Sequence, residues 1–310
     1  MMDKAIENVT IIGAGALGAI YGSIFYQMDT RCVSFIAGGD RYERLRKEGV
    51  AVNGKLFNIQ AYRPEENLPP ADLILVAVKH HQLQDAISDM KMRVGPETVI
   101  ISVMNGIDSE RLIGAALGEE EVLYAIAVGI DAVRSENQTT YSQQGKILFG
   151  EANNTSVSTK VKRVQDFFTR AGIHFETPAD MLRTLWWKFM INVGINQASA
   201  VLRAPYGAFQ VPGEARDLME AAMREVIALA ERENVSLSED DIHAWLGVLS
   251  GLKPEGKTSM LQDVEAGRKT EVEMFAGRII ELGRLHSVPT PVNDRLFEQI
   301  REIERETFIP

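Results

Sequence analysis

The chain has 310 residues and a single cysteine, Cys32, which excludes an intramolecular disulfide and a cage of thiolate metal ligands. Its five histidines show no metal-ligand spacing, and the adjacent pair His80-His81 would point to opposite faces of a strand. The N-terminus lacks the apolar stretch of a signal peptide, and no run of about 18 apolar residues occurs. We therefore expect no metal site, no membrane partner and a cytoplasmic protein.

An excess of positive charge is also missing. The chain has 33 Lys and Arg residues against 43 Asp and Glu residues, so its net charge is −10. Proteins that bind nucleic acid need a basic face to neutralise phosphates, so we expect no nucleic-acid partner. This balance still allows one small basic pocket for an anionic substrate. The length favours two domains of roughly 150 residues each.

The first half of the chain alternates between strand-like and helix-like segments. Short β-branched runs predict strands at 9–12, 32–36, 73–78, 98–103 and 122–127, and the first two are followed by predicted helices at 16–28 and 41–47. Such alternation indicates parallel βαβ units. The segment 139–149, which contains Gly145, predicts a hairpin that closes the sheet.

The second half has almost no strand signals. Helical patterns cover 181–202, 214–233, 239–250 and 259–286, with glycine and proline between them. We therefore predict an α/β protein with a Rossmann-type doubly wound sheet, followed by an all-helical C-terminal domain. The predicted dinucleotide-binding domain covers residues 1–180, and the predicted helical domain, for substrate binding and catalysis, covers residues 181–310.

A glycine-rich turn follows the first predicted strand. It reads Gly13, Ala14, Gly15, Ala16, Leu17 and Gly18, and it opens a predicted helix. In this context the backbone N–H groups and the helix dipole favour a pyrophosphate, and each glycine allows a close approach. The three-glycine pattern alone also fits an ordinary tight turn. Its place between a strand and a helix favours a dinucleotide.

The end of the second strand usually selects between the two nicotinamide cofactors. An acid there binds the ribose of NAD, whereas an arginine favours the 2′-phosphate of NADP. The sequence has no acid at this point, and Arg41 and Arg44 lie just beyond it. Their alternative role is a solvated helix face shared with Glu43 and Glu48. NADPH is therefore favoured, and NADH stays open.

Two polar residues follow later predicted strands. Lys79 comes directly after an apolar run, and Asn105 comes directly after another. The carboxyl ends of parallel strands line the crevice of an open α/β sheet, so both side chains should face a bound ligand. Lys79 would meet a phosphate, a ribose hydroxyl or an anionic substrate. Its alternative is a surface lysine that only aids solubility.

The most informative segment is an apolar stretch that contains Lys188, Asn192 and Asn196. At 3.6 residues per turn, this spacing places all three along one helix face. Unpaired polar groups are costly in a core, so a ligand-binding face is favoured over a solvent-exposed one. A lysine there suits ketone reduction, because its ammonium can stabilise charge developing on the carbonyl oxygen and then donate a proton.

Ser259 and Glu271 mark the last candidate segment. Ser259 also fits a helix cap. In one continuous helix the two residues would lie about 18 Å apart, at 1.5 Å per residue. They could then not both touch a small substrate. Either one of them meets the cofactor, or the helix is broken near Gly267.

Taken together, these motifs resemble the ketopantoate reductases (2-dehydropantoate 2-reductases) of pantothenate biosynthesis. The resemblance covers essentially the whole chain. The matching segments are 13–18, Val78-Lys79, Asn105-Gly106, Trp187-Lys188 with Asn192 and Asn196, 259–263 with Thr270-Glu271, and 289–293.

The resemblance implies NADPH-dependent reduction of the 2-keto group of ketopantoate to pantoate. Lys188 would be the general acid, and Asn192, Asn196 and Ser259 would contact the substrate. Glu271 would bind the cofactor or assist proton transfer. The remaining cofactor contacts would be the turn 13–18, Arg41, Lys79 and Asn105.

Three positions depart from the family pattern. Gly38 stands where the family usually has an arginine, and we expect Arg41 to replace it. Gln197 stands for a proline and Tyr206 for an asparagine that contacts substrate, so a related branched 2-keto or hydroxy acid is an alternative substrate. A non-catalytic cofactor sensor is a further alternative, and the polar groups on the helical half argue against it. The helical half is compatible with a homodimer.

Overall fold

The computed structural model describes residues 4–135 and 138–307. The chain forms two compact units, Met1–Leu182 and Arg183–Pro310. No helix in the described part is both long enough and apolar enough to cross a lipid bilayer.

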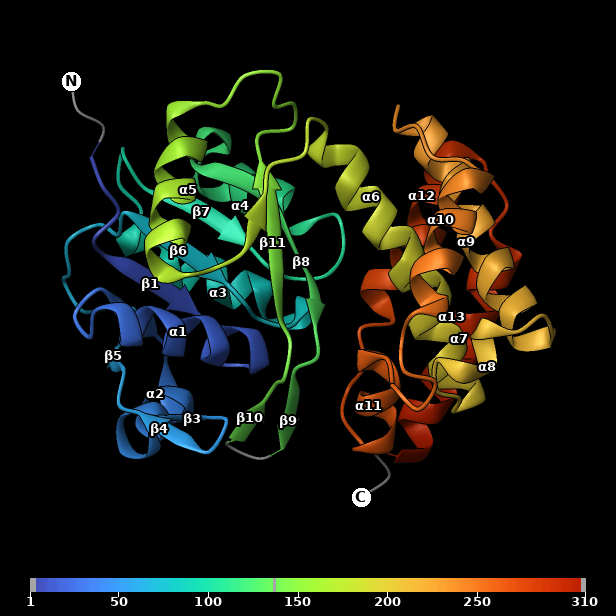
Figure 1. Ribbon diagram of the computed structural model, residues 1–310, viewed down its shortest axis with the longest axis horizontal. Helices are drawn as coiled ribbons and strands as arrows, with labels where there is room; N and C mark the ends of the chain where they lie inside the picture. The colour runs from blue at the N-terminus through green and yellow to red at the C-terminus, as the bar shows by residue number, and fades with distance from the viewer. Residues whose placement is uncertain (1–3, 136–137, 308–310) are drawn as a thin grey trace. The chain divides into compact units, whose positions relative to one another are not determined.

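The first unit contains a central sheet with helices packed around it (Figure 1). This sheet has eight strands, in the order β12-β11-β8-β7-β6-β1-β2-β5. Its parallel strands are β1 (Val9–Ile12), β2 (Val33–Ile36), β5 (Gln60–Tyr62), β6 (Leu73–Val76), β7 (Val99–Ser102) and β8 (Val122–Ile130). The antiparallel β11 (Gln144–Gly150) and then β12 (Phe175–Glu176) extend one edge. The strand order reverses between β1 and β6, which confirms the predicted doubly wound sheet.

Helices cover both faces of this sheet because successive strand residues point to opposite sides. Ile11 and Leu75 pack into one core with α1 (Ala16–Met28) and α5 (Thr159–Ala171). Ile12 and Val76 pack into a second core with α3 (Leu83–Met90) and α4 (Ser109–Leu117). Both sides are apolar, so the strands read as continuous runs of Val, Ile and Leu.

A second, four-stranded sheet lies in the same unit, in the order β4-β3-β10-β9. Its strands are β3 (Val50–Val52), β4 (Lys55–Phe57), β9 (Val133–Ser135) and β10 (Gln138–Thr140). The predicted hairpin at 139–149 is therefore wrong, since β10 belongs to this small sheet and β11 pairs with β8. The Asp131 carboxylate accepts hydrogen bonds from the backbone of Ser142 and Gln143. These bonds join the residue that follows β8 to the residues that precede β11.

The second unit is helical, as predicted (Figure 1). Its elements are α6 (Met181–Ile191, which begins in the first unit), the π-helix η4 (Asn192–Asn196), α7 (Gln197–Leu202), α8 (Gly207–Gln210), α9 (Glu214–Arg232), α10 (Glu239–Ser250), α11 (Ser259–Glu265), the π-helix η5 (Glu273–Gly277), α12 (Arg278–His286) and α13 (Pro291–Thr307). The helical pattern over 259–286 is not one continuous helix, which agrees with the second of the two alternatives given for Ser259 and Glu271. It is broken after Glu265, where Gly267 has a φ of +61° that a continuing helix cannot accept.

The core of this unit forms around the π-helix η4. Gly194 lies so close to α9 that a Cβ there would meet Met223 at 2.6 Å and the backbone of Met219 at 3.0 Å. Phe189 of α6 contacts Trp186 edge-on and also packs on Phe275 of η5. This packing fixes the helix that carries the candidate polar residues.

Candidate functional site

The glycine turn lies between β1 and α1. Gly13 has a φ of +102°, and a Cβ there would come within 2.6 Å of the Ala77 carbonyl at the end of β6. A Cβ at Gly18 would overlap the Gly13 carbonyl, so Gly18 lets α1 start directly on the turn. A Cβ at Gly15 would meet only the Ala77 oxygen, at 3.7 Å. Two of the three glycines are thus needed by the fold, and Gly15 leaves space beside the turn.

This turn fits a dinucleotide phosphate. No described side chain caps the N-terminus of α1, and its first turn carries no acidic residue. The unpaired N–H groups and the positive end of the helix dipole therefore suit an anion. Ala14, Gly15, Ala16 and Leu17 are all half-buried, which gives a ligand access to the backbone.

Lys79 and Asn105 follow the two strands next to the turn. Lys79 begins the short 3₁₀ helix η1 (His80–Gln82), three residues after β6 ends, and its backbone N–H donates to Gln82 Oε1 at 3.3 Å. Asn105 follows β7 and precedes Gly106, which has a φ of +92°. Both side chains are half-buried. β1, β6 and β7 are neighbours, so the glycine turn, Lys79 and Asn105 share one edge of the sheet.

A buried polar chain holds the loop that carries Asn105. Ser109 Oγ donates to Glu110 Oε2 at 2.8 Å and lies 2.8 Å from Ser102 Oγ. The backbone N–H groups of Met104 and Ala125 donate to Ser102 Oγ and to Glu110 Oε1, at 3.4 and 3.5 Å. Burial raises the pKa of Glu110 to about 7. Local sequence patterns did not predict this network.

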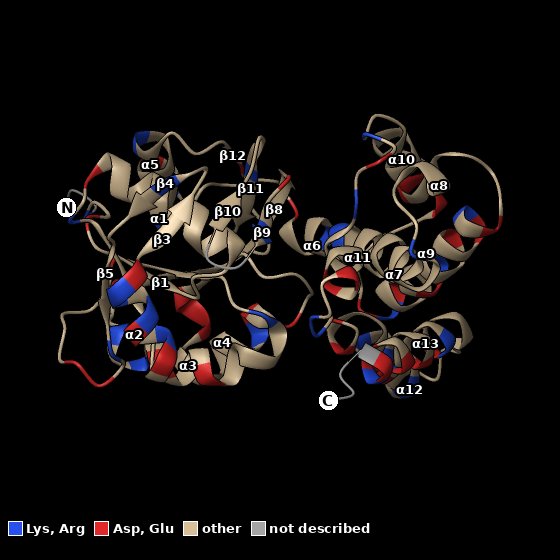
Figure 2. Ribbon diagram, turned by 90° about the horizontal axis from the view of Figure 1, so that it is seen from below, with Lys and Arg blue, Asp and Glu red and all other residues tan. Residues whose placement is uncertain are grey.

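The two candidate arginines lie on α2 (Gly39–Glu48), among the blue and red segments of this helix in Figure 2. Both are exposed. The charge of Arg41 acts on Asp89 of α3, where it partly offsets the rise in pKa caused by burial and by Asp85. The charge of Arg44 acts instead on Arg134 of β9. The two arginines of α2 therefore face different surroundings.

In the second unit, Lys188 lies on α6, and Asn192 and Asn196 are the first and last residues of η4. None of the three is exposed, so this line does not form a solvated helix face. η4 is a short π-helix, a feature that is frequent at functional sites. The spacing of the three polar residues could not predict it.

Asn196 joins two of the candidate residues. Its Nδ2 donates to Asn192 Oδ1 at 3.0 Å, and its Oδ1 accepts from Ser259 Oγ at 3.2 Å. Asn196 is 5% exposed, whereas Asn192 is half-buried and Ser259 is exposed. Thr258, not Ser259, caps α11, because its side chain accepts from the Leu261 N–H. The alternative role of Ser259 as the helix cap is therefore wrong.

Gln197 is fully buried and holds the helices around η4 together. Its Nε2 donates to the Val193 carbonyl at 2.8 Å and to Asn293 Oδ1 at 3.0 Å. Its Oε1 accepts from the Ala276 N–H of η5, also at 3.0 Å. With an exposed fraction of 0%, Gln197 supports the site from within the core.

Glu271 lies in the turn between α11 and η5 and is half-buried. The break after Glu265 means that the distance expected for a continuous helix does not apply. Its neighbour Thr270 is buried, and both the N–H and the hydroxyl of Thr270 donate to Glu304 of α13. The Glu271 carbonyl also accepts from the Phe275 N–H. The position of Glu271 is thus fixed from two sides.

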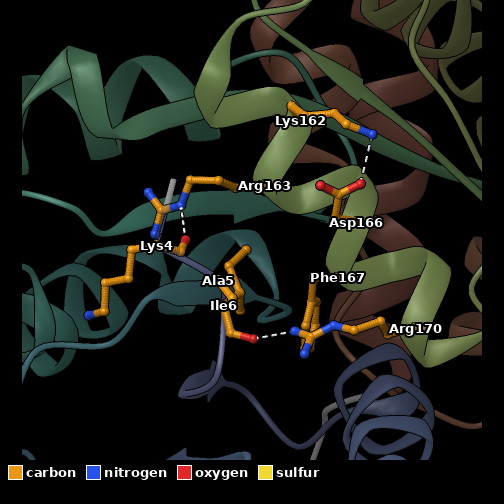
Figure 3. Close-up of a pocket in the computed structure, with 8 residues that line it drawn as sticks. All are labelled: Lys4, Ala5, Ile6, Lys162, Arg163, Asp166, Phe167 and Arg170. Carbon is orange, nitrogen blue, oxygen red and sulfur yellow. Dashed lines mark hydrogen bonds and ion pairs between the residues drawn. The ribbon is translucent and has the colours of Figure 1, made fainter. Parts of the chain in front are cut away.

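A cavity of about 220 Å³ lies elsewhere in the first unit, between α5 and the segment that precedes β1 (Figure 3). Its basic side chains make internal contacts: Arg163 donates to the Lys4 carbonyl, Arg170 donates to the Ile6 carbonyl, and Lys162 pairs with Asp166. Residues before β1 lie at the amino edge of the sheet. Ligands of such sheets bind at the opposite, carboxyl edge, so this cavity is not the cofactor site.

Comparison with known proteins covers nearly the whole chain. The family model described as ketopantoate reductase PanE/ApbA matches residues 9–154, and its C-terminal counterpart matches residues 180–304. The 2-dehydropantoate 2-reductase of Archaeoglobus fulgidus is 27% identical over 96% of this chain and 98% of its own length. No three described His, Cys, Asp or Glu side chains form a cluster able to hold a metal ion.

Solved structures agree with this family match. The 2-dehydropantoate 2-reductase of Methylococcus capsulatus has a TM-score of 0.82 and is 26% identical, over 98% of both chains. A D-mandelate dehydrogenase, solved with NADH and anilino(oxo)acetate, has a TM-score of 0.87 and is 20% identical, over 97% of this chain and 100% of that chain. The latter likeness shows a shared fold.

Proposed function

This chain belongs to the ketopantoate reductase family and is an oxidoreductase, and we propose that it reduces 2-dehydropantoate (ketopantoate) to pantoate with NADPH. The observation that carries this proposal is the hydrogen-bonded group that Ser259 of α11 forms with Asn192 and Asn196, which lie in the largely apolar segment of α6 and η4. Structural packing alone would not require the buried Asn196 there, because burying a polar group is costly. Recognition of a polar substrate gives the group a role.

In the proposed complex the first unit holds the cofactor. The glycine turn binds the pyrophosphate through backbone N–H groups, and Lys79 and Asn105 contact the cofactor from the ends of β6 and β7. The bound nicotinamide supplies the hydride that reduces the ketone carbon. Arg41 remains a candidate contact for the adenosine end of the cofactor.

The second unit would bind the keto acid. Asn196 is buried and orients its two partners, so the substrate reaches chiefly the amide of Asn192 and the hydroxyl of Ser259. Lys188 would stabilise the negative charge that develops on the ketone oxygen and then transfer a proton from Nζ to it. Glu271 would bind the cofactor or return a proton to Lys188. The alcohol product gains one hydride at carbon and one proton at oxygen, so the reaction balances.

A second candidate is the reduction of a different 2-keto acid. The phenol ring of Tyr206 packs against Gly256, in the loop that leads to Ser259, and burial raises the pKa of Tyr206. Tyr206 therefore stays protonated and puts a large amphipathic group against the loop that leads to Ser259. The fold shared with a D-mandelate dehydrogenase makes the keto acid of mandelate a natural comparison substrate.

A panel of 2-keto acids at saturating NADPH separates these candidates. We expect kcat/KM to be highest for ketopantoate, with lower values for phenylglyoxylate and for unbranched keto acids. If phenylglyoxylate or another acid is preferred, the reductase assignment stands and the ketopantoate assignment fails. If no keto acid supports cofactor oxidation, the enzyme assignment itself fails.

A further inference from the structure

Ser102 is a polar residue at a position where the sheet would accept an apolar one. It is the last residue of β7 and is fully buried. Side chains two apart on a strand point to the same face, so Ser102 faces the core that Ile100 shares with Ile113 of α4. An apolar side chain there would need no hydrogen bonds, whereas a buried hydroxyl needs partners. Packing alone therefore does not explain the serine.

The partners of Ser102 close the loop that carries Asn105. Residues 103–108 form this loop, between the end of β7 and the start of α4 at Ser109. The hydroxyls of Ser102 and Ser109, the two residues that flank the loop, lie 2.8 Å apart. The N–H of Met104 also donates to Ser102 Oγ, at 3.4 Å. One hydroxyl thus holds both the base of the loop and the residue just before Asn105.

The hydrogen bonds of this group run in one direction. Ser109 Oγ donates its single hydrogen to Glu110 Oε2 at 2.8 Å, so Ser102 is the donor in the bond between the two serines. The donors therefore lead from the Met104 N–H through Ser102 and Ser109 to the buried Glu110 carboxyl group, whose Oε1 accepts from the Ala125 N–H of β8 at 3.5 Å. Buried polar networks of connected bonds make the structure around them rigid.

We propose that Ser102 and Ser109 are positioning residues that hold Asn105 against the bound cofactor. This inference rests on the proposed function, in which Asn105 contacts NADPH from the end of β7. Loops are mobile, and a binding side chain on a loop keeps its geometry only when hydrogen bonds behind it support the loop. Gly106 follows Asn105 directly, with a φ of +92°, and has no side chain to fix the loop. The two flanking serines supply that support.

A double-mutant cycle on NADPH affinity tests this inference without turnover. The dissociation constant is measured by calorimetry for the wild-type protein, Ser102→Ala, Asn105→Ala and the double variant. We expect Ser102→Ala alone to weaken NADPH binding by at least about fivefold, because the Met104 N–H loses its buried acceptor and the loop shifts. In the Asn105→Ala background the same substitution should change the affinity by less than about twofold, since the side chain that Ser102 positions is gone.

Ser109→Ala repeats the cycle from the other side of the loop and should give the same pattern. Ser88→Ala is the matched control, because Ser88 is exposed on α3 and its hydroxyl donates to the Gln84 carbonyl. It should leave the affinity unchanged in both backgrounds. Urea unfolding of each variant establishes that it is folded under the conditions of the titration.

The outcomes are separable. If Ser102→Ala weakens binding equally with and without the Asn105 side chain, the serine acts on the fold or on another contact, and the inference is overturned. It is also overturned if both serine variants keep the wild-type affinity or if neither of them folds, and NADPH-dependent turnover by the wild-type protein can still stand.

Two further results reach the proposed function itself. If Asn105→Ala does not weaken binding, the cofactor contact assigned to Asn105 is wrong and the inference fails with it, while keto-acid turnover still decides the reductase assignment. If the wild-type protein does not bind NADPH, the NADPH assignment fails and the inference fails with it.

Discussion

Lys188 is the residue on which the proposed chemistry depends. It is half-buried on α6, four positions before Asn192. We expect Lys188→Ala to lower kcat with the preferred keto acid by at least about 10²-fold, because a positioned general acid contributes that much. NADPH affinity should stay nearly intact, as the proposed cofactor contacts lie mainly on the first unit.

The control for this substitution is Lys162→Ala, which removes an exposed lysine paired with Asp166. It should leave turnover unchanged. Turnover that survives in Lys188→Ala would remove Lys188 from the proposed role.

Glu110 should make the stability of the protein depend on pH. The pKa of this buried carboxyl is raised from 4.5 to about 7, so its favourable contribution is complete below pH 4.5 and is lost as pH rises through about 7. A shift of this size corresponds to on the order of 3 kcal/mol of unfolding free energy. We expect Glu110→Gln to reduce the decline in stability between these pH values.

Urea unfolding of the wild-type protein and of Glu110→Gln, followed across this pH range, measures the effect. Glu119→Gln is the control, because Glu119 is exposed and should leave the pH dependence unchanged. Equal pH dependence in the wild-type protein and in Glu110→Gln would show that Glu110 does not titrate in this range.

At the scale of elements, the glycines of the turn have different roles: Gly18 is needed for folding, and Gly15 leaves space for a ligand. Gly18→Ala places a methyl group on the Gly13 carbonyl and should lower the thermal midpoint strongly. Gly15→Ala meets only ordinary contacts, so the protein should fold normally and lose affinity for NADPH, because the methyl group occupies the space beside the turn. Thermal unfolding together with NADPH titration distinguishes the two, and similar behaviour of both variants would contradict this division of roles.

The two π-helices, η4 and η5, are connected by one buried side chain, that of Gln197. Gln197→Leu leaves the Val193 carbonyl and the Ala276 N–H without their buried partner. Losses of this kind cost on the order of 3 kcal/mol in unfolding free energy. We also expect KM for the keto acid to rise, because η4 carries Asn192 and Asn196.

Chemical denaturation and steady-state kinetics measure both effects of Gln197→Leu. Gln84→Leu, at an exposed position of α3, makes the same chemical change outside the core and should alter neither quantity. A normal KM in a destabilised Gln197→Leu protein would limit Gln197 to a structural role.

Across the whole molecule, the sequence predicted those helices and strands whose apolar pattern extends over several consecutive residues. The runs of Val, Ile and Leu predicted the central strands, and the period of apolar residues predicted helices such as 181–202 and 239–250. Strands of three residues, such as β9 and β10, are too short to show a period. The helical pattern across Gly267 left open whether the helix is broken there, and the backbone shows that it is.

In the candidate site, too, the sequence predicted local features better than contacts between distant segments. Residues close together in the sequence, such as Lys188, Asn192 and Asn196, could be placed along one helix face by their spacing, and the bond between the two asparagines agrees with it. Contacts between distant segments could not be predicted in this way. For example, nothing in the residues near Ala14 indicates that Arg134 lies beside it. Gln197 is a further example. As a departure from the family pattern it pointed to the substrate, and in the structure it is part of the buried core.

The most direct test of the central claim is NADPH oxidation with ketopantoate, followed by the absorbance of the reduced nicotinamide and repeated with NADH. We expect steady turnover with kcat/KM for NADPH at least about 10-fold above that for NADH, as one charge-assisted phosphate contact implies. The absence of ketopantoate-dependent oxidation with either cofactor would contradict the account.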